Sequence, residues 1–173
     1  MKSKRMAELL QKGHKLIVGY IVAAYPDREG FFEVLKECNR GLDILEIGFP
    51  SGNPYVDGQV IRQVHSLADH QAANELEYWQ RIRQAVDMPI WIMAYKADFV
   101  DTGMYRRLAE NGLIDAVVLP DMEEDRLNGI SEELGPYGVD TVRFLNPGMA
   151  EIEILSPAFR LFSISLTCLS FLR

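Results

Sequence analysis

Residues 42–50, LDILEIGFP, form a short apolar run that ends at a proline. The run is rich in Ile and Leu and too short for a buried helix, so it predicts a β-strand over Leu42–Gly48. Its apolar positions do not alternate cleanly with polar ones, which is typical of a strand covered by helices on both faces. The segment therefore predicts a strand inside a parallel sheet of an α/β protein.

Runs of the same kind recur along the chain. They predict strands at Leu16–Ala23, Ile90–Tyr95, Asp115–Leu119 and Val139–Leu145, and a weaker run predicts a sixth at Phe159–Ile164. Polar segments with helical periodicity predict helices at Arg28–Asn39, Asn74–Val86, Val100–Asn111 and Glu123–Leu134. Each strand and its helix take about 25 residues, except in the second unit, which carries Pro50–Gly58 and an extra helix as an insertion.

This alternation fits either a (β/α)₈ barrel or an open doubly wound sheet. No glycine-rich phosphate motif follows the first strand, which favours the barrel. A complete barrel takes about 250 residues, whereas this chain has 173 and reaches only a sixth strand. We therefore expect a single domain over residues 1–173, a partial TIM-type barrel of about six parallel strands that lacks the last βα units. Its open sheet edge favours self-association.

The composition excludes several classes of function. A net charge of -7 gives a surface that repels phosphodiester backbones, so we expect no nucleic-acid partner. The two cysteines and three histidines show no metal-ligand spacing, so we expect neither a disulfide framework nor a metal, no cofactor, and histidines at the surface. No apolar stretch approaches the roughly 20 residues of a membrane span, and the N-terminus is amphipathic, so we expect a cytoplasmic protein without membrane contact.

Glu46 is the candidate for acid-base chemistry. The period of two places it on the same face as Ile44 and Gly48, inside an apolar run. Burial there would raise its pKa toward neutrality, which lets one carboxyl group both give and take a proton. The alternative is a structural glutamate paired with a basic neighbour. Asp57, in the loop that follows, is on its own an ordinary turn or cap residue.

The sequence around the two carboxylates indicates a function for them. Residues 46–50, EIGFP, followed by residues 54–58, PYVDG, resemble the signature of the tryptophan synthase alpha subunit family. Further similarity lies at residues 61–65, 93–95 and 115–121. The resemblance covers roughly residues 14–147, which we interpret as the family-like core, preceded by an N-terminal helix at 1–13 and followed by a divergent tail at 148–173.

The resemblance implies a lyase of tryptophan biosynthesis. Such an enzyme cleaves indole-3-glycerol phosphate to indole and glyceraldehyde 3-phosphate by a retro-aldol step, and it hands indole to a beta subunit. By position, Glu46 is implied as the proton shuttle and Asp57 as the group that holds the ring N–H and stabilises its positive charge. Tyr20 and Tyr95 are implied as substrate-binding residues, although Tyr20 fits a core aromatic equally well.

Departures from the family pattern keep two alternatives open. The loop that contacts the beta subunit in the family reads Ser51–Asn53 here in place of F-S-D, and the segments Ala24–Pro26 and Tyr95–Asp98 also differ from the family pattern. After Pro147 the sequence does not match the family's later phosphate-binding units. The chain is therefore also compatible with a non-catalytic relative that acts as a binding partner, or with a barrel lyase for a different substrate.

Overall fold

The computed structural model describes residues 1–13, 15–143 and 166–167. Its described strands form one parallel sheet in the order β5-β4-β3-β2-β1-β6. They are β1 (Val18–Val22), β2 (Ile44–Gly48), β3 (Ile90–Met93), β4 (Ala116–Val118), β5 (Asp140–Val142) and β6 (Leu166–Thr167). The order from β1 to β5 confirms the succession of parallel strands that the sequence predicts.

Several predicted strands extend one or two residues beyond the observed ones, because the backbone stops pairing with the neighbouring strand before the apolar run ends. The sixth strand predicted at residues 159–164 lies outside the described residues. The two residues of β6 pair with Gly19 and Tyr20 of β1. Self-association through a sheet edge stays a prediction, as does the division into a helix, a core and a tail.

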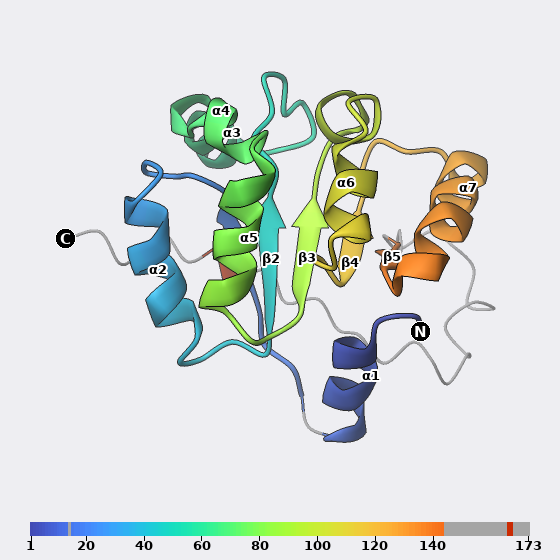
Figure 1. Cartoon of the computed structure of the whole chain (residues 1–173). Coiled ribbons are helices and arrows are strands. Elements are labelled where there is room, and N and C mark those ends of the chain that lie inside the picture. Colours follow the sequence, from blue (N-terminus) through green and yellow to red (C-terminus); the bar gives the residue numbers. More distant parts are fainter. Residues whose placement is uncertain (14, 144–165, 168–173) are drawn as a thin grey trace.

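Four helices cover one face of the sheet (Figure 1). They are α2 (Gly30–Cys38), α5 (Leu76–Ala85), α6 (Met104–Glu110) and α7 (Glu124–Leu134), and a 3₁₀ turn, η2 (Gly135–Tyr137), follows α7. The helix predicted at Val100–Asn111 begins late, because a π-helical turn, η1 (Lys96–Val100), comes first and Gly103 adopts φ 75° before α6. That left-handed conformation suits glycine and separates the two helical segments.

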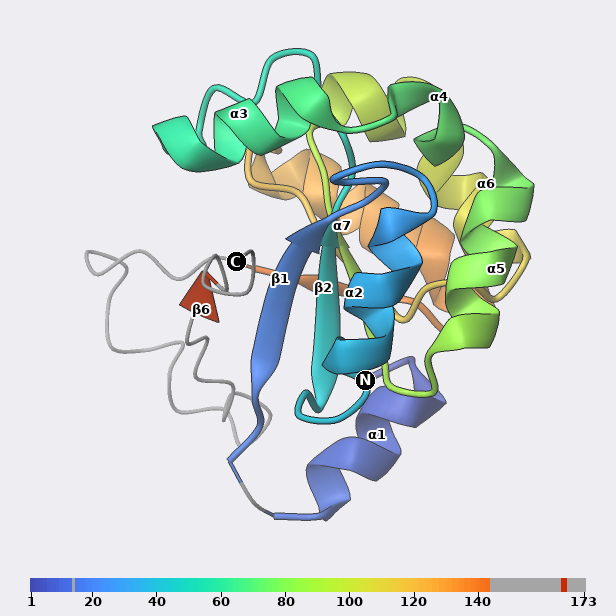
Figure 2. The same ribbon diagram turned by 90° about the vertical axis from the view of Figure 1, so that its left-hand side faces the viewer.

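The remaining helices lie at the two ends of the strands. Helix α3 (Gln59–Leu67) is the extra helix predicted after the insertion, and it crosses the carboxyl ends together with the short α4 (His70–Ala73), as Figure 2 shows. Helix α1 (Lys4–Gln11) lies below the amino ends (Figure 1). The site at the carboxyl ends is therefore framed by α3 and its preceding loop.

Both faces of the strands are apolar, as the continuous apolar runs predict. Leu45 and Ile47 of β2 join the core cluster that includes the buried side chains of α2, α5, α6 and α7. Ile44, on the opposite face, joins a second cluster with Met6 and Leu9 of α1. We call this second face the inner face, because it corresponds to the interior of a closed barrel.

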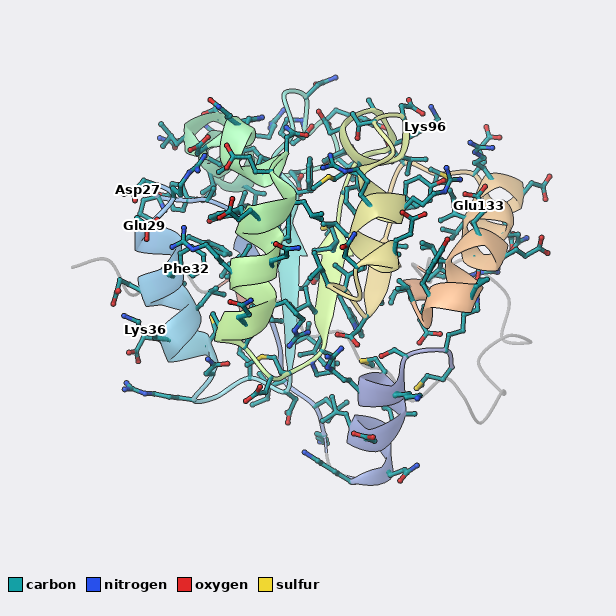
Figure 3. The ribbon with its side chains drawn as sticks, in the orientation of Figure 1. Asp27, Glu29, Phe32, Lys36, Lys96 and Glu133 are labelled. Atoms are coloured by element: carbon teal, nitrogen blue, oxygen red, sulfur yellow. The ribbon has the colours of Figure 1, made fainter. Side chains whose placement is uncertain are left out.

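A polar contact joins two helices of the outer layer. Arg81 of α5 lies over the ring of Phe32 at 4.3 Å from its centroid and pairs with Glu29 at 2.9 Å. Figure 3 labels Phe32 on α2 and Glu29 immediately before this helix. Because Glu29 is mostly exposed, the ion pair adds little stability by itself. The guanidinium still covers the aromatic ring and so contributes to the packing of α2 on α5.

Asp115, immediately before β4, fixes the base of the sheet. Its carboxylate accepts hydrogen bonds from the Ile90 N–H at 2.9 Å and from the Ser3 hydroxyl at 2.8 Å, and it pairs with Arg83 at 3.2 Å. Ser3 also caps α1 by accepting from the Met6 N–H. One buried carboxylate thus connects the N-terminal helix to the starts of β3 and β4.

Asp115→Asn should lower the free energy of unfolding by about 3 kcal/mol, because the mostly buried Arg83 loses its counter-charge. Urea denaturation of the full chain measures this change. Asp125→Asn, on the exposed surface of α7, serves as the matched control and should cost less than about 1 kcal/mol. Equal effects of the two substitutions would contradict the assigned role of Asp115.

Candidate functional site

Glu46 occupies the middle of β2 and points to the inner face of the sheet. Its neighbours in the parallel register are Tyr20 of β1 and Trp91 of β3, which share this face. Ile44, two residues earlier, is fully buried there. Glu46 is thus surrounded along and across the sheet by apolar or aromatic groups.

Burial determines the protonation of Glu46. Loss of solvent raises its pKa from the ordinary 4.5 to about 7, and desolvation is the cause of this shift. None of the ion pairs among the described residues includes Glu46. At neutral pH this carboxyl group is therefore divided between its protonated and ionised forms.

Tyr20 leans from β1 over β2. Its hydroxyl and ring lie where a side chain on Gly48 would begin, so the glycine leaves the room that the tyrosine fills. Burial is the main cause of the raised pKa of Tyr20, and the charges of Asp57 and Glu46 raise it further. The carboxylates of Glu46, on a strand, and Asp57, in a loop, thus both act electrostatically on one phenol.

Asp57 is held by a tyrosine from the next strand unit. The Tyr95 hydroxyl, just beyond β3, donates to Asp57 Oδ2 at 2.7 Å and accepts from the Val56 N–H at 3.2 Å. Burial and this hydrogen bond raise the pKa of Tyr95. The ring of Tyr55 packs against that of Tyr95 with centroids 5.3 Å apart. The loop after β2 is thereby fixed to the end of β3.

The structure corrects the prediction for one histidine. His65 of α3 is 2% exposed, so it does not lie at the surface. Its Nδ1 accepts from the Ser51 N–H at 3.1 Å, and its Nε2 lies 3.7 Å from Asp57 Oδ2. The sequence contained a signal for this burial, because helical spacing places Val64 and Ala68 on the same buried face of the helix as His65.

Ser51 and Asp98 also belong to the surroundings of the site, although the sequence pattern predicts a functional role for neither. The Ser51 hydroxyl donates to Asp98 Oδ2 at 2.6 Å and accepts from the Asn53 N–H at 3.1 Å. The segment Ser51–Asn53, where the sequence departs from the family pattern, is therefore hydrogen-bonded to η1. A serine supplies both of these hydrogen bonds with one small side chain.

The four residues predicted for the site lie on or just beyond β1 to β3, and Glu46, Asp57 and Tyr95 all act electrostatically on Tyr20. Glu46 and Tyr20 lie on the strands, and Asp57 and Tyr95 lie in the segments that leave β2 and β3. Within the described ranges, no cluster of three or more His, Cys, Asp or Glu side chains is arranged to hold a metal ion. The same residues contain no helix with the length and apolar character to cross a membrane.

The raised pKa of Glu46 should make stability depend on pH. Because the folded-state pKa of about 7 lies above the ordinary 4.5, the folded protein binds the proton more tightly. The stabilisation that this proton contributes is therefore fully present below about pH 4.5, and it is lost as the pH rises through 7. Glu46→Gln should remove up to about 3 kcal/mol of this loss.

Urea denaturation at pH 5 and pH 8 measures this dependence for both proteins. Glu37→Gln, on the exposed side of α2, is the control and should keep the wild-type dependence. An unchanged pH dependence in Glu46→Gln would show that the carboxyl group titrates normally in the folded chain.

The chain is similar in sequence to proteins of one known family. The sequence profile described as tryptophan synthase alpha chain matches residues 6–156. A tryptophan synthase alpha chain of Syntrophomonas wolfei is 28% identical over 166 residues, covering 90% of this chain and 62% of that protein. One from Aquifex aeolicus is 30% identical over 142 residues, covering 78% of this chain and 54% of that protein. The chain thus spans about three fifths of the length of these relatives.

Solved structures agree at the level of the fold. Tryptophan synthase subunit alpha from Legionella pneumophila superposes with a TM-score of 0.70 at 20% identity, over 87% of this chain and 60% of that one. Tryptophan synthase from M. tuberculosis gives a TM-score of 0.66 at 20% identity, over 80% and 60%. The parallel sheet is accordingly part of a TIM-type barrel. From the match over most of its length, the chain belongs to the tryptophan synthase alpha chain family.

Proposed function

We propose that this chain is a carbon–carbon lyase of tryptophan biosynthesis, which cleaves indole-3-glycerol phosphate to indole and glyceraldehyde 3-phosphate in the cytoplasm. The observation that carries this proposal is Glu46, a carboxyl group with a pKa of about 7 on the apolar inner face of the sheet. Membership in the tryptophan synthase alpha chain family supports the choice of substrate.

The reaction needs proton transfer in both directions. A proton must be added to the ring carbon that carries the glycerol chain, and another must leave a glycerol hydroxyl as the carbon–carbon bond breaks. A carboxyl group performs both transfers well when its pKa lies near the working pH, because both forms are then populated. Glu46 meets this condition through burial alone. We assign it the role of proton shuttle.

Cleavage also develops positive charge at the ring nitrogen. A fixed carboxylate next to the ring N–H stabilises that charge without reorganising during the reaction. Asp57 suits this role, because the hydroxyl of Tyr95 holds its Oδ2 at 2.7 Å. Tyr95 thus positions the carboxylate, and the ring of Tyr20 offers an aromatic surface beside Glu46 on which an indole can pack.

Indole release from indole-3-glycerol phosphate tests the proposal directly. Glu46→Gln should lower kcat by about 100-fold or more, because the amide keeps the shape but transfers no proton. Asp57→Asn should lower kcat/KM by a similar factor. Glu37→Gln on α2 is the control and should keep wild-type rates. Equal rates for Glu46→Gln and wild type would refute the assignment of Glu46.

We propose further that a beta subunit binds at a surface formed by α3 and by the loop that follows β2. Four large apolar side chains are exposed there, which is more than isolated surface residues explain. They are Tyr55, Val56, Val60 and Leu67, with exposed fractions of 52% to 59%. Such side chains supply the apolar centre of a protein–protein interface.

Calorimetric titration of the chain with a tryptophan synthase beta subunit tests this surface. Val60→Ser and Leu67→Ser together should weaken binding by about tenfold or more, through loss of apolar contact. Ile17→Ser, at an exposed apolar position before β1, is the control and should leave the affinity unchanged. Binding without turnover would favour the non-catalytic alternative, and the absence of binding would refute the proposed partner.

A further inference from the structure

In the described part of the chain, one buried side-chain nitrogen or oxygen lacks a hydrogen-bond partner, and it belongs to His65. The atom is Nε2, and the whole residue is 2% exposed. A buried polar hydrogen without a partner costs about 1–3 kcal/mol. Such an atom is uncommon in folded proteins and needs an explanation. Its position, beside one of the two proposed functional carboxylates, suggests one.

The backbone of the β2 loop fixes the protonation of this imidazole. The Ser51 N–H donates to Nδ1 at 3.1 Å. Because a backbone N–H can only donate, Nδ1 must carry a lone pair, and a neutral ring must then carry its proton on Nε2. Burial lowers the pKa of His65, which agrees with a neutral ring. The unpartnered atom is therefore an N–H donor.

This donor lies close to Asp57. Nε2 lies 3.7 Å from Asp57 Oδ2, slightly beyond the length of a hydrogen bond. The same oxygen already accepts from the Tyr95 hydroxyl at 2.7 Å. The Asp57 carboxylate thus has one hydrogen bond formed and a second donor within reach of a movement of less than 1 Å.

We propose that His65 is a positioning residue for Asp57. Its Nε2–H, oriented by the Ser51 backbone, faces Oδ2 together with Tyr95 and keeps the carboxylate turned toward the N–H of a bound indole ring. This inference rests on the proposed function, which assigns the ring N–H to Asp57. A second donor restricts the rotation of the carboxylate and so favours one geometry of acceptance.

Two substitutions separate this role from a structural one. Asparagine at position 65 retains an acceptor near Nδ1 for the Ser51 N–H but has no donor near Nε2, whereas glutamine retains an N–H near Nε2 but loses that acceptor. If His65 acts on Asp57, His65→Asn is the harmful change. If it only anchors the loop, His65→Gln is the harmful change.

The first measurement compares the binding of indole with that of 1-methylindole, which lacks the ring N–H. The wild type should prefer indole by about tenfold, the value of one hydrogen bond to a charged group. His65→Asn should reduce this preference to about twofold or less, and His65→Gln should retain most of it. A preference that is lost in the glutamine variant and kept in the asparagine variant would overturn the proposal.

The second measurement needs no ligand and no turnover. Nitrogen-15 NMR of the wild type should show an unprotonated Nδ1 and a protonated Nε2 on His65 at pH 7. The Nε2 resonance should shift in Asp57→Asn and stay in place in the surface control Asp125→Asn. The other charged or titratable groups that act on this ring are His70 and Asp98, and both are unchanged in these variants.

If the Nε2 resonance of His65 does not shift in Asp57→Asn, the proposal is overturned regardless of the indole-binding result. A wild type that binds both indoles equally would instead refute the assignment of the ring N–H to Asp57. In that case the NMR result by itself decides whether His65 acts on Asp57. Failure of the inference and failure of the proposed function are therefore distinguishable.

Discussion

The parallel register of β2 between β1 and β3 is the constraint on which the site depends. It aligns Glu46 with Tyr20 on one side and with Trp91 on the other. A shift by one residue would turn Glu46 into the helix-covered core and Leu45 toward the inner face. The register is protected by burial of both faces of β2, since Ile44, Leu45 and Ile47 are all fully buried. Fold and site geometry thus share one cause.

The site uses buried polar groups in two different ways. No described ion pair includes Glu46, and burial raises its pKa to about 7. Asp57 instead lies among donors, with Tyr95 bonded to it and His65 close by. Two carboxyl groups in one site with different surroundings are a common basis for separate roles in acid-base chemistry.

The polar contacts at the two ends of the sheet have distinct tasks. At the amino ends, Asp115 joins Ser3, Arg83 and the Ile90 backbone, and these bonds hold α1 in place. At the carboxyl ends, Ser51 and Asp98 fix the loop that carries Asp57. Barrels usually carry stabilising contacts at the amino ends of their strands and functional residues at the carboxyl ends, which is the end where the candidate site lies.

The sequence by itself determined the parallel α/β fold and the face of β2 on which Glu46 lies. Both follow from local patterns, a repeat of strand and helix and a period of two within a strand. The tertiary structure decided what no local pattern contains. Tyr95 meets Asp57 across 38 residues of sequence, and Ser3 meets Asp115 across 112.

The same reason explains the residues that were misplaced or missed. His65 has no metal-ligand spacing, so the sequence put it at the surface, whereas packing of α3 over the strand ends buries it beside Asp57. The pKa of Glu46 likewise depends on how completely its neighbours exclude water. Local patterns assign a residue to an element and a face. Only the packing of elements distant in sequence sets its partners, its burial and its charge.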